Sequence, residues 1–145
     1  MDEASVWLAK AAIAELITRY AVLNDAADWE AVAALYTEDG RMSRPTAPDD
    51  FVSGRAAILQ AFRSRPPRAS RHIVANILVT LEGDARALAT SQILLYTGSA
   101  VDDGGLPALS ASSPLIGSWE DTLVRTTAGW RFFERRGRLD FRPRG

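Results

Sequence analysis

The spacing of apolar residues changes once along this chain, and that change limits the possible folds more than any other feature. Up to residue 64 the apolar residues recur every three or four positions, which is typical of amphipathic helices. From residue 71 onward the pattern favours long strands separated by short turns. Helices followed by antiparallel strands indicate an α+β domain, with the helices packed on one face of a curved sheet.

This pattern predicts three helices and four long strands within a single domain of residues 1–145. The helices are expected at residues 5–26, with Ser5 as N-cap, at 28–36, with Asp28 as N-cap, and at 54–64. The segment "RMSRPTAPDDFVSG" begins like a strand and then becomes turn-rich, because Pro45 and Pro48 prevent a long strand. The strands are expected at 71–82, 86–101, 115–126 and 130–141.

The composition argues against several classes of function. With 17 basic and 18 acidic residues the net charge is -1, which does not indicate a nucleic-acid or membrane partner. The chain has no cysteine, which excludes disulfides, thiolate metal sites and a cysteine nucleophile. Its carboxylates show no metal-binding spacing, so neither a metal nor another cofactor is expected. No signal-peptide pattern and no membrane-spanning apolar run is present, which favours a cytoplasmic protein.

The only histidine, His72, lies at the start of a predicted strand in "SRHIVANILVT". Histidine is a favoured proton carrier because it changes charge near neutral pH. Strand alternation places Val74, Asn76 and Leu78 on the face of His72, and places Ile73, Ala75, Ile77 and Val79 on the other face. The first face suits a pocket wall, on which Asn76 can orient a ligand. Because both faces are largely apolar, the pattern predicts a homodimer or homotrimer.

Four separated segments resemble, in order and spacing, the SnoaL-like branch of the superfamily named after nuclear transport factor 2 (NTF2-like). They are "ELITRYAVLNDAADWEAVAALYTEDG", "GRAAI", "RHIVANILV" and "GSWEDTLVRTTAGWRFFERR". The resemblance implies a cone in which about three N-terminal helices pack on a strongly curved sheet of mixed, mainly antiparallel strands. Such a cone encloses a pocket for a small apolar ligand.

The resemblance also implies a set of site residues. Dehydratase and dehydrochlorinase members pair an aspartate near the end of the first helix with a histidine at the start of a central strand, and Asp25 and His72 match those positions. Tyr20 matches a tyrosine of bile-acid 7α-dehydratase, and Arg135 matches an arginine of the last strand. The lysine of the dehydrochlorinase and the second histidine of scytalone dehydratase have no counterpart here.

An elimination or isomerisation next to a carbonyl needs a base and a proton donor. His72 would act as the base, Asp25 would hold its ring, and Tyr20 would donate a proton. Structural alternatives stay open for all three: His72 as a structural histidine, Asp25 as a helix-end residue or cap, and Tyr20 as part of the core. Arg135 is expected to bind substrate, although Arg131 and Arg136 are equally able to face inward.

Five large side chains are further candidates for the pocket wall, and each also fits plain core packing. They are Trp119, Tyr96, Phe51, Phe62 and Met42. The predicted function is a cofactor-independent lyase or isomerase, similar to dehydratases or ketosteroid isomerase, acting on a small apolar, cyclic or aromatic substrate. Two alternatives remain: a non-catalytic protein that binds a small ligand in the same cone, and a structural partner subunit.

Overall fold

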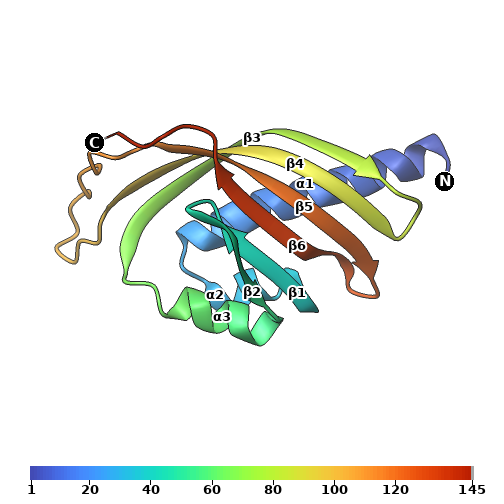
Figure 1. The fold of residues 1–145 in the computed structure, drawn as a ribbon, viewed down its shortest axis with the longest axis horizontal. Coiled ribbons are helices and arrows are strands. Elements are labelled where there is room, and N and C mark those ends of the chain that lie inside the picture. The colour runs from blue at the N-terminus through green and yellow to red at the C-terminus, as the bar shows by residue number, and fades with distance from the viewer. Residues whose placement is uncertain (145) are drawn as a thin grey trace.

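A six-stranded sheet curls around a long N-terminal helix in the computed structural model, which describes residues 1–144 (Figure 1). Helix α1 (Glu3–Asp25) packs mainly against β3 (Arg68–Leu81), and the short helices α2 (Trp29–Ala33) and α3 (Arg55–Arg63) pack on each other below one end of the sheet. The predicted α+β arrangement with three helices is confirmed. None of the helices is both long enough and apolar enough to cross a membrane, within residues 1–144.

The helix ends differ slightly from the prediction. Asp2, not Ser5, is the N-cap of α1, and its carboxylate accepts a hydrogen bond from the Ser5 backbone N–H at 2.7 Å. Asp28 caps α2 as predicted, accepting from the Ala31 N–H at 3.3 Å. Helix α2 ends at Ala33, and Tyr36 begins a strand instead of extending the helix, because its backbone pairs with Phe132 of the last strand.

The strands run in the order β2-β1-β6-β5-β4-β3. Their bounds are β1 Tyr36–Arg44, β2 Ala47–Ser53, β4 Arg86–Ser99, β5 Leu115–Thr126 and β6 Gly129–Leu139. The pairing of β1 with β6 is parallel, and all other neighbours are antiparallel. The expectation of a turn-rich segment after Pro45 is wrong, because β2 continues through Pro48. An edge strand tolerates proline, since its outer side has no hydrogen-bond partner to lose.

Strand β3 does not keep the predicted alternation over its whole length. A β-bulge interrupts its pairing with β4 between Ala75 and Leu78, and Asn76 has a positive φ of 53°. The bulge inserts an extra residue, so the side chains after it change faces. Ile77 and Val79 consequently lie on the helix side with His72 and Val74, whereas Asn76 and Leu78 lie on the exposed side.

The core fills the space between α1 and the concave face of the sheet. Alternate residues of the central strands face α1, because successive side chains of a strand point to opposite faces. The buried apolar set includes Ile13, Leu16, Ile17 and Tyr20 of α1, Phe62 of α3, and Ala87, Ala89, Ile93, Trp119, Leu123 and Phe132 of the sheet. The end of the cone nearest α2 and α3 is less completely filled, and the candidate site lies there.

Candidate active site

Asp25 and His72 are in direct contact where α1 ends beside β3. The Asp25 Oδ1 and His72 Nδ1 atoms are 2.6 Å apart, and both side chains are largely buried, at 14% and 11% exposure. Asp25 Oδ2 accepts the His72 backbone N–H at 2.9 Å, and Oδ1 also accepts the Ser70 hydroxyl at 3.0 Å. Ser70 and His72 reach the same carboxylate because residues two apart on a strand share a face.

The hydrogen bonds determine the charge of Asp25 and the orientation of the imidazole. Burial alone would raise the pKa of Asp25, but the hydrogen bonds from the His72 ring, the His72 backbone and Ser70 outweigh burial and lower this pKa below its ordinary value. An ionised carboxylate only accepts hydrogen bonds, so His72 Nδ1 must carry the proton of the shared bond. The lone pair of the neutral ring then lies on Nε2.

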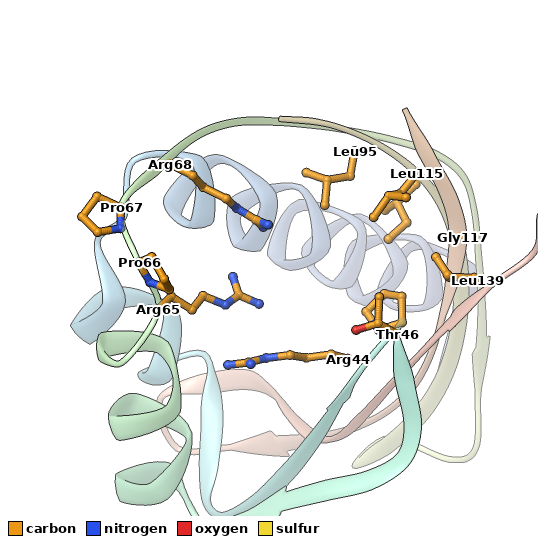
Figure 2. Close-up of a pocket in the computed structure, with 12 residues that line it drawn as sticks. Arg44, Thr46, Arg65, Pro66, Pro67, Arg68, Leu95, Leu115, Gly117 and Leu139 are labelled. Atoms are coloured by element: carbon orange, nitrogen blue, oxygen red, sulfur yellow. The ribbon is translucent and has the colours of Figure 1, made fainter. Parts of the chain in front are cut away.

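His72 also lines a small cavity of about 50 Å³. Tyr20, Met42, Phe62 and Trp119 line it as well. Its wall also includes Arg44, Pro45, Arg65, Arg68, Ile93 and Leu95, all of which line a larger cavity of about 420 Å³. The two cavities are therefore adjacent, and His72 lines the inner one. Leu95 of β4, Leu115 of β5 and Leu139 of β6 lie along the outer one (Figure 2).

Tyr20 lies at the centre of an aromatic cluster. Its ring meets those of Tyr36, Phe62, Trp119 and Phe132 with centroids 5.6–6.4 Å apart. The Tyr36 hydroxyl donates a hydrogen bond to the Tyr20 hydroxyl at 3.2 Å, which leaves the proton of Tyr20 available to another acceptor. Burial raises the pKa of Tyr20, so this phenol stays protonated and suits a proton donor.

Arg135 lies behind the cavity wall and does not point into the cavity. Its guanidinium donates to both carboxylate oxygens of Asp121, at 2.9 and 3.2 Å, and both side chains are almost completely buried. The guanidinium carbon also lies 4.4–4.5 Å from the ring centroids of Tyr20, Trp119 and Phe132. Arg135 therefore supports two cavity-lining rings, in an ion pair that the cross-strand register of Asp121 with Arg135 creates.

Three predicted pocket residues lie away from both cavities. Asn76 lies within the bulge, on the exposed side of β3, and its amide donates a hydrogen bond to the Gln92 side chain at 2.5 Å. Tyr96 follows Leu95, whose side chain lines both cavities, so strand alternation directs the tyrosine to the opposite face. Phe51 is on the edge strand β2, where its ring packs under the guanidinium of Arg41 at 4.1 Å.

Several residues at the site carry no signal that sequence reasoning recognised. Ser70 holds Asp25, and Asn24 is buried beside it with an amide oxygen that has no hydrogen-bond partner within residues 1–144. Arg44, Arg65 and Arg68 line the cavities. The segment "RPPR" at residues 65–68 ends a helix. Its two prolines also stiffen the backbone, and its two arginines add positive charge. Within residues 1–144, no three histidine, aspartate or glutamate side chains are grouped to hold a metal ion.

Comparison with known proteins identifies the fold and the family. A protein from Novosphingobium aromaticivorans, provisionally named a scytalone dehydratase, superposes with a TM-score of 0.81 at 22% identity, covering 97% of this chain and 89% of its own. An NTF2-like protein with a cystatin-like fold from the same organism gives 0.75 at 27% identity, covering 93% and 84%. A protein from Catenulispora acidiphila in complex with S-DNPA gives 0.70 at 23% identity, covering 95% and 96%.

The fold is therefore NTF2-like, as the sequence resemblance implies. No curated protein matches the chain. The family model described as the SnoaL-like domain matches residues 6–136, which is most of the sequence. On that match, this chain belongs to the SnoaL-like domain family.

Proposed function

We propose that this protein is a cofactor-independent lyase or isomerase that acts on a small cyclic ketone or hydroxy-ketone, with His72 as its general base. The observation that carries the proposal is the 2.6 Å contact of Asp25 with His72 Nδ1, next to a cavity that the same imidazole lines. A base held by a carboxylate and facing an enclosed space is the arrangement that proton abstraction requires. Two similar proteins agree with a small-molecule role, one provisionally named a dehydratase and one in complex with S-DNPA.

The reaction begins when His72 Nε2 removes a proton from the carbon next to the substrate carbonyl. The electron pair of that C–H bond moves toward the carbonyl and forms an enolate, while Asp25 stabilises the imidazolium. In an elimination, the enolate electrons form the C=C bond and expel a β-hydroxyl, which leaves as water when Tyr20 or the imidazolium protonates it. In an isomerisation, the imidazolium returns the proton to a different carbon.

Solvent deuterium exchange tests the base without requiring the natural substrate. Proton abstraction from 1-tetralone in D₂O replaces the hydrogens next to its carbonyl, which proton NMR follows over time. We expect exchange catalysed by the wild-type protein to fall at least about 1,000-fold in His72→Ala. Conversion of 3-hydroxycyclohexanone or 3-cyclohexenone to the conjugated enone then separates elimination from isomerisation.

Asp25 is a positioning residue in this scheme, and graded variants test that role. We expect Asp25→Asn to lower the rate about 100-fold or more and to alter its pH profile, because an amide cannot stabilise the imidazolium. Ser70→Ala, which removes one hydrogen bond to Asp25, should have a much smaller effect on the rate. Arg86→Gln, on the far end of β4, is the control that leaves the rate unchanged. Equal rates in wild type and His72→Ala would contradict the proposal and leave a binding role for the cavity.

We also propose that the protein assembles as a homodimer or homotrimer through the outer face of the sheet. Ile73 and Leu78 of β3 and Leu88 of β4 expose 47%, 72% and 39% of their surfaces on this side. Ile73 also borders a hollow of about 390 Å³, which Ala75, Leu94 and Phe141 line as well. An exposed apolar face of this kind favours association with a second copy.

A further inference from the structure

Three arginine side chains from different parts of the chain converge on the outer cavity. Figure 2 shows the guanidinium groups of Arg44, Arg65 and Arg68 pointing into the same space, from the end of β1, the segment after α3 and the start of β3. Pro66 and Pro67 join Arg65 to Arg68, and proline restricts the backbone dihedral φ. Two of the three charges are thus presented from a stiff segment at one edge of the cavity.

None of these three arginines forms an ion pair with a carboxylate within residues 1–144. In contrast, Arg41, Arg63, Arg136 and Arg138 are each paired with an aspartate or glutamate. Arg44 donates to the Ala61 carbonyl at 3.1 Å, but its buried Nε has no hydrogen-bond partner within residues 1–144. Donors of a buried charged group usually have partners, so this Nε indicates a missing acceptor.

The charges also disfavour one another. Burial, and then the positive charge of Arg44, lowers the pKa of Arg65 to about 10, with a smaller contribution from Arg68. Loss of hydration at the cavity and the charge of Arg44 lower the pKa of Arg68, which Asp25 partly opposes. An anion between the guanidinium groups would relieve this repulsion and satisfy their donors.

The rest of the cavity is largely apolar, with Thr46 as the exception. Ile93, Leu95, Leu115 and Leu139 line the side that faces the arginines, and the volume of about 420 Å³ is in the range of small-molecule sites. A ligand that fits both halves has an apolar ring system and one negatively charged oxygen group. The inner cavity beyond the arginines leads to His72.

We infer that the ligand of this protein is an apolar, cyclic molecule carrying a carboxylate or another oxyanion, which Arg44, Arg65 and Arg68 bind while its ring system extends along the leucine-lined wall. This inference deepens the proposed function, on which it rests for the idea that the cavity takes a substrate. It adds that the substrate is an acid, whose charged group lies at the arginine side of the cavity, across from the leucine-lined wall.

Isothermal titration with matched probes tests the inference independently of catalysis. Naphthalene-2-carboxylate combines an apolar body with an oxyanion, naphthalene-2-carboxamide has the same body without charge, and inorganic phosphate has the charge without the body. We expect the carboxylate to bind at least about 10-fold more tightly than either other probe, because the amide loses the charge-assisted hydrogen bonds and phosphate loses the apolar contacts.

Variants identify the groups responsible. Arg65→Met and Arg44→Met keep the apolar stem, and each should weaken binding of the carboxylate about 10-fold to 100-fold while leaving the amide affinity nearly unchanged. Retained amide binding also shows that the variant is folded. Arg68→Met should have a smaller effect, because Arg68 is the most exposed of the three. Arg86→Gln, which removes an exposed arginine far from the cavity, is the matched control and should bind both probes like the wild type.

Equal binding of carboxylate and amide to the wild type would overturn the inference, and so would no binding of the carboxylate at millimolar concentration. If phosphate bound as tightly as the carboxylate, the inference that the ligand has an apolar ring system would be overturned. His72→Ala should bind the carboxylate normally. Selective binding of the carboxylate without any proton exchange would therefore reject the proposed function and support the anion site. Proton exchange of a neutral ketone, with equal binding of carboxylate and amide, would support the proposed function and reject the anion site.

Discussion

Asp25 carries its charge in a largely buried position because three hydrogen bonds converge on it, and its contribution to stability should therefore depend on pH. The folded-state pKa is lower than the ordinary value of 3.8, so the carboxylate stabilises the fold above that value, and the stabilisation is lost as pH falls through the folded pKa. We expect Asp25→Asn to lower the free energy of unfolding by about 1–2 kcal/mol at pH 7, and by progressively less as the pH falls below the ordinary pKa of 3.8.

Urea unfolding of wild type and Asp25→Asn at pH 7 and pH 3 measures this difference. Asp121, whose pKa burial raises against the opposing effect of Arg135, is present in both proteins, so its titration cancels. Asp28→Asn, a change at an exposed helix cap, is the matched control and should show no comparable pH dependence. A difference that is equally large at both pH values would contradict the role of the charge.

Asp121 and Arg135 form a buried ion pair, in which each charged side chain depends on the other. Both side chains are at most 1% exposed and the pair has two hydrogen bonds, so removing either partner leaves the other charge buried and alone. We expect Asp121→Asn or Arg135→Met to cost about 3–5 kcal/mol of unfolding free energy each. The double variant Asp121→Asn with Arg135→Met should cost clearly less than the sum of the two single variants, which a double-mutant cycle in urea checks. Additive losses would contradict an isolated pair.

At the scale of an element, the bulge in β3 decides which side chains reach the core. Asn76 has a φ of 53°, a left-handed conformation that asparagine and glycine adopt more readily than branched residues. We expect Asn76→Val to lower the free energy of unfolding by about 1–2 kcal/mol, and Asn76→Gly to change it by less than about 0.5 kcal/mol. Chemical denaturation of both variants measures this.

The hydrogen bond from Asn76 to Gln92 needs a separate control, since both substitutions remove it. Gln92→Ala breaks that exposed bond and leaves the backbone of the bulge intact, so it should resemble Asn76→Gly. A Gln92→Ala variant as unstable as Asn76→Val would show that the side-chain contact, and not backbone conformation, sets the cost.

At the scale of the whole molecule, the outer face of the sheet predicts association. Light scattering after size exclusion should give two or three times the 15.8 kDa mass of one chain. Ile73→Lys places a charge on that face and should reduce the mass to that of a monomer, because burying an unpaired charge is unfavourable. Leu106→Lys, at a residue 97% exposed in the loop before β5, is the control that should leave the mass unchanged. A wild-type monomer would contradict the proposal.

The sequence by itself determined the elements and their order. Apolar periodicity is a local property, and it located α1, α3 and the four long strands close to their observed bounds. Apolar periodicity did not predict the hairpin of β1 and β2, because Pro48 indicates a strand break unless the strand is known to lie at an edge. The pairing of Asp25 with His72, 47 positions apart, came from a family resemblance and not from any spacing.

Only the tertiary structure decided on which side of the sheet certain side chains lie, and which charged residues from distant segments come together. The bulge that moved Asn76 away from the face of His72 arises from pairing with β4, and the inward turn of Arg135 arises from its register with Asp121. Arg44, Arg65 and Arg68 meet because the sheet curls back toward α3, although each alone reads as a surface arginine. Periodicity records which residues avoid water, but contacts between distant segments depend on register and curvature, which no local pattern contains.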